Sequence, residues 1–194
     1  MVNLNAKIRA AKTIGEMAAA IEPALWGFIT QAIQRDYTLQ QIETLAATPA
    51  KVNARIHSTL GRILWRYETR YAKVPEMRLE LSGDLTRRGS FDEIRGVFLH
   101  EIAHVLERLV PRSQSPRCHQ PKSHGPEWQR LAIALGVPAK STTSVGYAPR
   151  RKAQKIVGRC ERCGNNVKRA TRLRRHLTYR HLENQCGGRI QPTF

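Results

Sequence analysis

Apolar residues recur at helical spacing in the first 36 residues of the chain. One stripe lies in residues 4–20 and consists of Leu4, Ile8, Ala11, Ile14 and Ala18. A second lies in residues 23–36 and consists of Leu25, Phe28, Ile29, Ala32 and Ile33. Side chains three and four residues apart share one face of a helix. The pattern therefore predicts two helices that cover a core, the second with Pro23 in its first turn.

Residues 38–60 fit two structures. One is a helix-turn-helix, with a first helix over 38–46 and a second that enters the major groove of DNA. The other contains a strand, because Val52, Ala54 and Ile56 alternate with polar residues. We favour the strand.

Alternation also predicts the next strand. Residues 77–82 have apolar side chains at every second position, and Gly83 and Asp84 end the run. If the segment before it is extended as well, His57 is an ordinary strand residue and not a metal ligand.

The longest helical pattern covers residues 91–109. Its apolar positions are Phe91, Ile94, Val97, Phe98, Ala103, Val105 and Leu106. Ser90 and Glu93 fit a capping box, and Pro111 lies where such a helix should stop. A loop rich in proline, serine and basic residues follows, and then a shorter helix over 127–135 that ends at Gly136.

Two histidines and a glutamate lie in the middle of this long helix, in the order His100-Glu101-Ile102-Ala103-His104. Residues four apart on a helix project from the same face, so the two imidazoles can share one Zn²⁺. The glutamate between them can orient and deprotonate a metal-bound water. The alternative is a surface helix whose two histidines and glutamate are solvated and bind no metal.

A catalytic zinc needs a third protein ligand and one open position. Three residues compete for that place: His124, which lies beside Gly and Pro; Glu127, at the start of the shorter helix; and His119, in the loop. Spacing does not decide between the first two. The metzincin continuation is absent, because Glu107 stands where that pattern requires Gly. Cys118 is interpreted as an incidental loop thiol.

The charge of the chain points to a polyanionic partner. The formal net charge is +18 over 194 residues, with 41% hydrophobic residues, so a core can form beside a strongly basic surface. Nucleic acid comes first and an anionic membrane second. No apolar run approaches the roughly 20 residues of a membrane span, and no targeting segment is evident. We expect a cytoplasmic protein, nucleoid-associated if bacterial, with no membrane partner.

The last 45 residues combine this charge with a second metal pattern. From residue 150 on, thirteen basic residues stand against two acidic ones, a net charge of +11. Cys160 and Cys163 form a zinc knuckle, and His181 with Cys186 completes a closed Cys₃His structural site. His176 competes for the fourth place. A segment this short cannot bury a stabilising core without such a staple.

The same segment supplies candidate nucleic-acid contacts. Arginines pair with phosphates, and one aromatic ring can stack on an unpaired base. The candidates are Arg169, Arg172, Arg174, Arg175, Tyr179 and Arg180. No base-reading pattern is present, so we expect binding to DNA, single-stranded or structured, that is salt-dependent and weakly sequence-specific.

The two motifs together resemble a known family. The run from His100 to His104, followed by Ser-His-Gly-Pro-Glu-Trp at 123–128, is similar to the SprT-like/Spartan metalloproteases, in which HExxH precedes His-Gly-Pro-Glu-aromatic. The resemblance covers residues 51–137 and the tail. It implies that His100, His104 and His124 are the zinc ligands and Glu101 the general base, with Glu127 outside the metal.

The resemblance also has implications for the sheet and the tail. In the family a strand near 52–56 precedes a turn, here 59–61, and a second strand, here 62–67. A strand beside the zincin helix offers a free edge to an extended substrate peptide. The family's C-terminal ribbon usually has a second Cys pair before Gly-Gly. In this chain His181 replaces the first Cys of that pair, with a longer spacing to Cys186.

We therefore predict an α+β fold: a zincin-like metalloprotease domain with N-terminal helices, a small antiparallel sheet and the HExxH helix, followed by a small zinc ribbon. The expected domains are 1–137, divided into a helical part over 1–50 and a catalytic core over 51–137; a linker over 138–154; and a basic zinc-ribbon module over 155–194.

The predicted function is that of a zinc metalloendopeptidase with one catalytic and one structural Zn²⁺. It hydrolyses, through a zinc-activated water, peptide bonds of proteins bound or crosslinked to DNA; the crosslink-repair role follows from the resemblance alone. The alternative is a non-catalytic, regulatory zinc-ribbon protein that binds nucleic acid. A third interpretation is a peptidase with a glutamate ligand that acts on free peptides.

Overall fold

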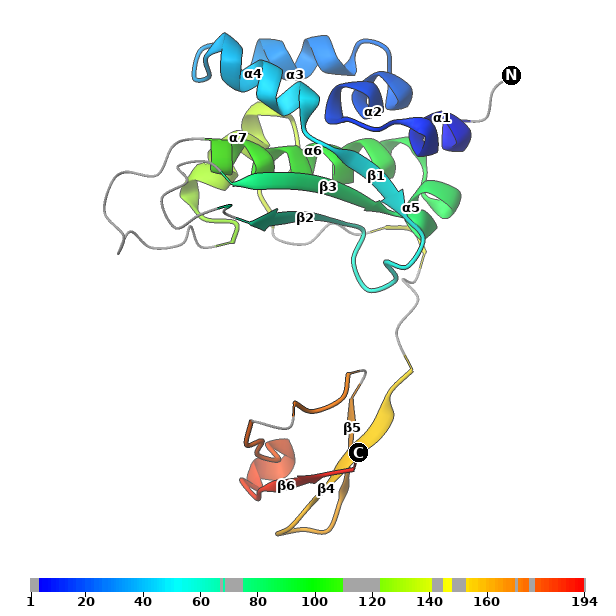
Figure 1. Ribbon diagram of the computed structural model, residues 1–194, viewed down its shortest axis with the longest axis vertical. Coiled ribbons are helices and arrows are strands. Elements are labelled where there is room, and N and C mark those ends of the chain that lie inside the picture. Colours follow the sequence, from blue (N-terminus) through cyan, green and yellow to red (C-terminus); the bar gives the residue numbers. More distant parts are fainter. Residues whose placement is uncertain are drawn as a thin grey trace. The chain divides into compact units, whose positions relative to one another are not determined.

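The chain divides into two units, Met1–Pro149 and Arg150–Phe194 (Figure 1). The computed structural model describes residues 4–66, 68, 75–109, 123–140, 145–147, 153–169, 171–174 and 177–193. Within these residues the first unit is mixed α+β and the second is a small sheet with one short helix. No helix in the described part of the chain is long and apolar enough to cross a membrane.

The first unit begins with four short helices: α1 (Leu4–Ala10), α2 (Ile14–Ile21), α3 (Leu25–Ile33) and α4 (Leu39–Ala47). The predicted single helix over 4–20 is wrong. The chain breaks at Thr13, whose side chain accepts a hydrogen bond from the Glu16 N–H and caps α2. The residues around the break bond to a distant segment, since the Ala50 N–H donates to the Lys12 carbonyl over 2.8 Å.

A three-stranded sheet follows, with β1 (Ala50–Asn53), β2 (Gly61–Arg66) and β3 (Glu76–Ser82) in the order β1-β3-β2. The helix-turn-helix alternative is wrong, because α4 leads directly into β1. The favoured strand is confirmed only in part, since β1 ends at Asn53 and excludes Ala54 and Ile56. The predicted all-antiparallel sheet is also wrong, because β1 runs parallel to the central strand β3. His57 lies in the loop after β1 and not in a strand.

Three helices complete this unit: α5 (Gly83–Arg88), α6 (Phe91–Leu109) and α7 (Pro126–Ala134). The capping box of α6 is confirmed. The Ser90 N–H donates to Glu93 Oε2 over 2.7 Å, and the Glu93 N–H donates to Ser90 Oγ over 3.2 Å. The pattern did not predict α5.

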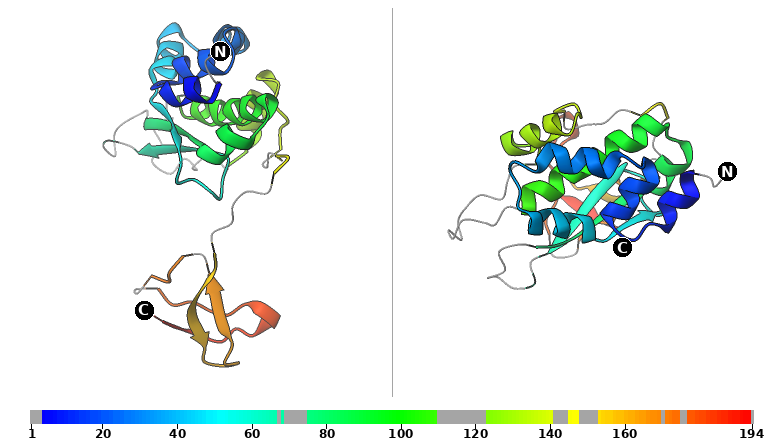
Figure 2. Two further views of the ribbon diagram at one scale, coloured as in Figure 1. Left: turned by 90° about the vertical axis from the view of Figure 1, so that its right-hand side faces the viewer. Right: turned by 90° about the horizontal axis from the view of Figure 1, so that it is seen from above.

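The core is one cluster of buried residues from the sheet, α6 and all four N-terminal helices. Alternation turns Met77, Leu79 and Leu81 of β3 towards buried side chains of α6, among them Phe98 and Ile102. Helices α1–α4 lie on the β1 side, so β2 forms the opposite edge of the sheet (Figures 1 and 2). The second face of the sheet carries no described helix (Figure 2).

The second unit has β4 (Lys155–Cys160), β5 (Asn166–Arg169) and β6 (Ile190–Pro192) in the antiparallel order β5-β4-β6, with a 3₁₀ turn, η1 (Glu183–Gln185). Its apolar cluster is small and consists of Val157, Leu173 and Ile190, with Val167 and Tyr179 against it. So little buried apolar surface requires a further source of stability.

Candidate functional site

Three histidines converge at one point of the first unit. α6 presents His100 and His104 from adjacent turns, and His124 comes from the segment just before α7. The His124 Nε2 lies 3.2 Å from both His100 Nε2 and His104 Nε2. Tetrahedral coordination with Zn–N bonds near 2.05 Å separates ligand nitrogens by about 3.3 Å. The three nitrogens therefore fit one zinc-sized ion, with the fourth position open.

The backbone of His124 gives its ring this direction. Its φ of +62° lies in the left-handed region, which is uncommon for a residue with a side chain. The Gln129 side chain donates to the His124 carbonyl over 3.2 Å, and Ser123 Oγ lies 3.1 Å from His124 Nδ1. The turn then leads into Gly125 at the N-cap and Pro126 in the first turn of α7.

Burial keeps these rings in the form that binds metals. Desolvation, with the neighbouring His104 and His124, lowers the pKa of His100 to about 4. Burial and His104 also hold the pKa of His124 below its ordinary value. Both rings are therefore neutral at neutral pH, with nitrogen lone pairs available for a cation.

Glu101 lies in the same site and is only 7% exposed. Burial raises the pKa of its carboxyl to about 8. Close contact with β2 fixes its position: a Cβ added at Gly61 would lie 2.8 Å from Glu101 Cγ and 2.9 Å from Oε1. Only glycine at this position leaves room for the carboxyl group, a constraint that the sequence did not reveal.

A groove of about 500 Å³ opens over the three histidines and Glu101. Its other lining residues are Ser58, Thr59, Leu60, Gly61, Arg62, Ile63, Trp65, Val97, Arg108 and Ser123. Most of them belong to β2 and the loop before it, so the outer strand forms one wall. A larger hollow of about 910 Å³ lies between α4 and the ends of β2 and β3, and no metal-binding group lies among its described lining residues.

Trp128 forms the floor of the site. It is fully buried, and its ring centroid lies 4.7 Å from that of His100, 5.3 Å from His104 and 4.5 Å from His124. One aromatic side chain thus packs against all three imidazoles. It restricts the rotamers that each can adopt.

The remaining candidates lie away from this point or outside the described residues. Both carboxylate oxygens of Glu127 accept hydrogen bonds from Arg130, at 2.8 and 3.2 Å, and Glu127 is not in the metal-sized group. Glu107, by contrast, places Oε2 3.9 Å from His104 Nδ1 and is 5% exposed. In the sequence Glu107 stands out only as a mismatch to the metzincin pattern. His119 and Cys118 fall outside the described residues.

The sequence model of the SprT-like family matches residues 29–147, which include the whole histidine site. The chain belongs to the SprT-like family. No curated protein and no solved structure matches the chain. The family match ends before the second unit, so the SprT-like domain and the cysteine-containing unit are distinct in sequence as well as in structure.

A second cluster lies beyond the SprT-like domain. The ligand atoms of Cys160, Cys163, His181 and Cys186 all lie within 4.8 Å of one another. The Cys160 and Cys186 Sγ atoms are 3.7 Å apart, against about 3.8 Å for tetrahedral Zn–S bonds of 2.3 Å. His176 falls outside the described residues. Four donors at these distances fit a closed structural zinc site.

Local contacts shape this cluster. Backbone N–H groups, first that of Cys163, lower the pKa of Cys160 to about 6, so its thiolate form is accessible. A Cβ at Gly188 would meet Cys160 Sγ at 2.6 Å, which explains the second Gly of Gly-Gly. His181 is 4% exposed, and its Nε2 lies 3.3 Å from Glu183 Oε2, so its Nδ1 faces Cys163.

The candidate nucleic-acid residues also lie in the second unit. The Arg169 guanidinium lies over the Tyr179 ring, 5.6 Å from its centroid, and the Tyr179 hydroxyl accepts from the Arg174 N–H over 3.2 Å. Arg180 Nη1 donates to the Gly187 carbonyl over 3.1 Å. Arg172 is exposed, and Arg175 falls outside the described residues. The tyrosine therefore already has a cation on one face of its ring.

Proposed function

We propose that this protein is a zinc-dependent endopeptidase that cleaves proteins bound or crosslinked to DNA. The observation that supports the proposal best is the convergence of three histidine nitrogens beside a buried glutamate in an open groove. A structural zinc site has four protein donors, whereas a catalytic one keeps a position free. Membership of the SprT-like family, a metalloprotease-like family, points the same way.

In this proposal His100, His104 and His124 hold the zinc. When bound, the ion polarises a substrate carbonyl and lowers the pKa of a water molecule. Glu101 accepts a proton from that water at its carboxylate and returns it to the departing amide nitrogen. Burial raises the pKa of this carboxyl group, which favours the protonated form that holds the proton between the two transfers. Trp128 holds the three rings in position.

The edge of β2 positions the substrate. Among the described strands β2 pairs only with β3, so it forms an edge of the sheet, and an edge strand can pair with a further chain. An extended peptide that adds to this edge lies along the groove, with its backbone fixed and its side chains in alternate positions. This arrangement recognises the peptide backbone more than any one side chain. It suits an enzyme with varied protein substrates.

The second unit supplies DNA binding in this proposal. A closed zinc site holds its small sheet together, and the basic residues around it contact phosphates with little sequence specificity. The role in crosslink repair is inferred from the family resemblance. The non-catalytic alternative partly depended on a helix-turn-helix, but α4 is followed by a strand. That alternative therefore depends on the second unit alone.

Glu101→Gln tests the proposal. The protein substrate is a basic DNA-binding protein, offered with and without single-stranded DNA, and zinc per chain is counted on the same samples. We expect cleavage by the wild type, stimulated by DNA, and none by the variant, with about two zinc ions in both. Retained cleavage in the variant contradicts the mechanism. Two zinc ions and DNA binding without cleavage by the wild type favour the non-catalytic alternative.

A further inference from the structure

The SprT-like domain has a cationic surface of its own. We propose that the open face of the β1-β3-β2 sheet binds the phosphate backbone of nucleic acid, separately from the basic second unit. The inference extends the proposed function and rests on it for its purpose, the delivery of DNA-bound protein to the groove. Its test measures binding and does not need peptidase activity.

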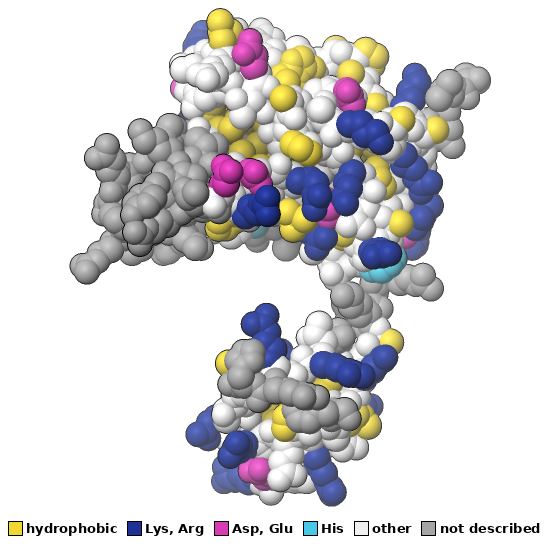
Figure 3. Space-filling model, viewed as in Figure 1, with side chains coloured by type: hydrophobic (Ala, Val, Ile, Leu, Met, Phe, Trp, Pro, Cys, Tyr) yellow, Lys and Arg dark blue, Asp and Glu magenta, His cyan; other side chains and the backbone are white. Residues whose placement is uncertain are grey.

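Three cations define this face, one from each strand. Alternation turns Lys51, Arg62 and Arg78 away from α6, towards the side that no described helix covers. Their side chains are 48%, 46% and 47% exposed. In Figure 3 Lys and Arg side chains gather over the sheet, with acidic side chains between and beside them.

One buried carboxylate organises the three cations. Glu80 is 1% exposed and pairs in register with Lys51 on one side and Arg62 on the other. Its Oε2 accepts from Arg62 at 2.7 and 3.0 Å and from Asn53 at 2.8 Å. Its Oε1 lies 3.3 Å from Lys51 Nζ and 3.4 Å from Arg78 Nε. A single pairing would neutralise Glu80, yet three cations surround it.

The surplus charge is therefore fixed in place. Three cations on one carboxylate leave a net charge of +2 on this cluster, and the shared anion orders their flexible side chains before any partner arrives. Ordering of that kind lowers the entropic cost of binding. The exposed guanidinium groups have further N–H donors, a geometry that matches phosphate oxygens.

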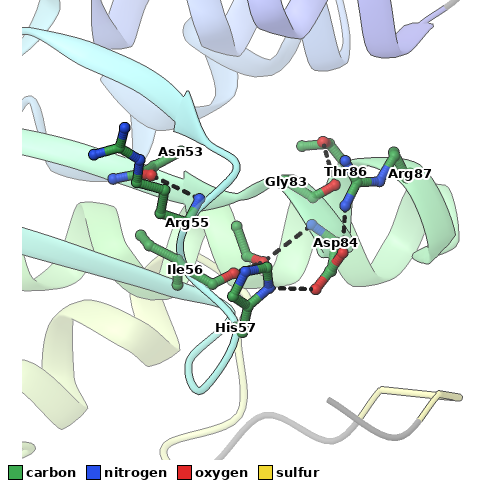
Figure 4. Close-up of polar contacts among 9 residues, drawn as sticks. Asn53, Arg55, Ile56, His57, Gly83, Asp84, Thr86 and Arg87 are labelled. Atoms are coloured by element: carbon green, nitrogen blue, oxygen red, sulfur yellow. Dashed lines mark hydrogen bonds and ion pairs between the residues drawn. The ribbon is translucent and has the colours of Figure 1, made fainter. Parts of the chain in front are cut away.

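The cationic face continues past the end of β1. Arg55 is exposed on the turn that follows the strand, and its backbone N–H donates to Asn53 Oδ1 over 2.9 Å. The next residues are held by Asp84, which contacts His57 Nδ1 at 3.0 Å and also pairs with Arg87 (Figure 4). This anchored loop leads directly into β2 and the groove.

A nucleic acid fits this surface better than a protein does. Stable protein interfaces have an apolar centre, whereas the exposed side chains at the middle of this face are charged. A polyanion with regular phosphates needs no such centre, and its affinity comes from cationic contacts. The net charge of the chain has the same sign as the face.

The surface also has a defined relation to the histidine site, because both include β2. Gly61, Arg62 and Ile63 all line the groove. The Arg62 guanidinium also donates to Glu80 on the open face. DNA on the face therefore lies against the same strand that forms one wall of the groove. A protein attached to that DNA can reach the outer edge of β2, so the face selects substrates by the nucleic acid to which they are bound.

The test is the affinity of the full-length chain for a fluorescein-labelled single-stranded oligonucleotide, measured by fluorescence anisotropy over a series of salt concentrations. Arg62→Gln with Arg78→Gln removes two charges and retains polar side chains. We expect about tenfold weaker binding near 0.1 M salt, and a salt slope lower by about 1.4, from 0.7 per lost phosphate contact. Zinc content and thermal unfolding check that the variant is folded.

The matched control is Arg9→Gln with Arg35→Gln, two exposed arginines of the N-terminal helical part. It changes the net charge equally. Because neither arginine belongs to the sheet face, we expect a loss of affinity below twofold. Glu80→Gln gives the opposite change. It removes the only anion of the cluster, retains hydrogen-bonding groups, and should tighten binding severalfold. This variant also keeps the proposal testable if the double variant does not fold.

Three results would overturn the inference. The first is an equal loss of oligonucleotide affinity in the two double variants. The second is an unchanged affinity in both Glu80→Gln and the single variant Arg78→Gln. The third is that Arg62→Gln with Arg78→Gln loses binding to a poly-glutamate peptide but not to the oligonucleotide. The last result would make the face a site for acidic protein. Failure of the peptidase proposal is distinguishable, because Glu101→Gln should bind the oligonucleotide like the wild type whether or not the wild type cleaves.

Discussion

The two metal-sized clusters of this chain are held in place in different ways. The three histidines project from α6 and the turn before α7, whose other faces are packed against a sheet and four helices. The cysteine cluster holds a unit whose buried apolar residues are only Val157, Leu173 and Ile190, with Cys160 and His181 buried beside them. In the first unit the fold positions the site. In the second unit the site takes the place of a core.

The largest effect should come from metal removal, which separates the two cases. Structural zinc contributes roughly 10–16 kcal/mol in zinc-finger peptides, so a chelator should unfold residues 155–194. All three tryptophans lie in the first unit, so their fluorescence should still report one cooperative urea transition. Hydrogen exchange of peptides from β4 measures the second unit. Protection of β4 that survives chelation would contradict the comparison.

Cys163→Ser sharpens this result without a chelator. It removes one donor of the second cluster and leaves the histidines unchanged. We expect loss of β4 protection, with the tryptophan transition and peptidase activity on free protein substrates retained. Loss of the tryptophan transition together with β4 protection would mean that the two units depend on each other.

The next effect concerns Gly61, which tests whether the rigid fold positions Glu101. A methyl group there would lie 2.8 Å from Glu101 Cγ, so Gly61→Ala should displace the carboxyl group. Displacement of about 1 Å costs on the order of 100-fold in rate, and the histidines should keep their zinc. Gly96→Ala is the control, because a Cβ there meets nothing within 4 Å. Equal activity in both variants would show that the contact has no role.

A smaller effect compares the acidic partner of a histidine in each cluster. Glu107 is 5% exposed and lies 3.9 Å from His104 Nδ1, whereas Glu183 is 84% exposed and lies 3.3 Å from His181 Nε2. Water screens an exposed charge far more than a buried one. Glu107→Gln should therefore weaken zinc binding about tenfold, and Glu183→Gln should have a lesser effect. Competition with a chromophoric chelator measures both zinc affinities. The reverse order would contradict this account.

The smallest effect is the contribution of Glu80 to the pH dependence of stability. Burial alone would raise its pKa, but hydrogen bonds from Asn53, Arg62 and Lys51 hold the pKa below the ordinary value of 4.5. A lowered pKa means that the ionised carboxylate stabilises the fold above pH 4.5 or so, and that this stabilisation is lost as the pH falls further. Urea unfolding with chelator present should show a smaller acid loss in Glu80→Gln. An identical pH profile would contradict the pairing.

What the sequence predicts well is local. The 91–109 helix, its Ser90–Glu93 capping box and the i, i+4 histidines follow from neighbouring residues, and the structure has all of them. Strand β3 was also predicted, apart from one residue at its start. Each of these features is set within a few residues of chain.

What the sequence does not predict depends on distant partners. The break at Thr13 is fixed by bonds to residues near 49, and the parallel pairing of β1 follows from a crossover that periodicity does not encode. Spacing could not separate His124 from Glu127, because the left-handed backbone of His124 decides which side chain turns inwards. The contact of Gly61 with Glu101 joins segments 40 residues apart.

The most direct test of the account is a zinc count on three proteins: the wild type, His124→Ala and Glu127→Ala. Native mass spectrometry gives zinc per chain, and cleavage of the DNA-bound substrate is measured on the same samples. We predict about two zinc ions with cleavage for the wild type and for Glu127→Ala, and one zinc ion without cleavage for His124→Ala. Two zinc ions in His124→Ala and one in Glu127→Ala would contradict the three-histidine site.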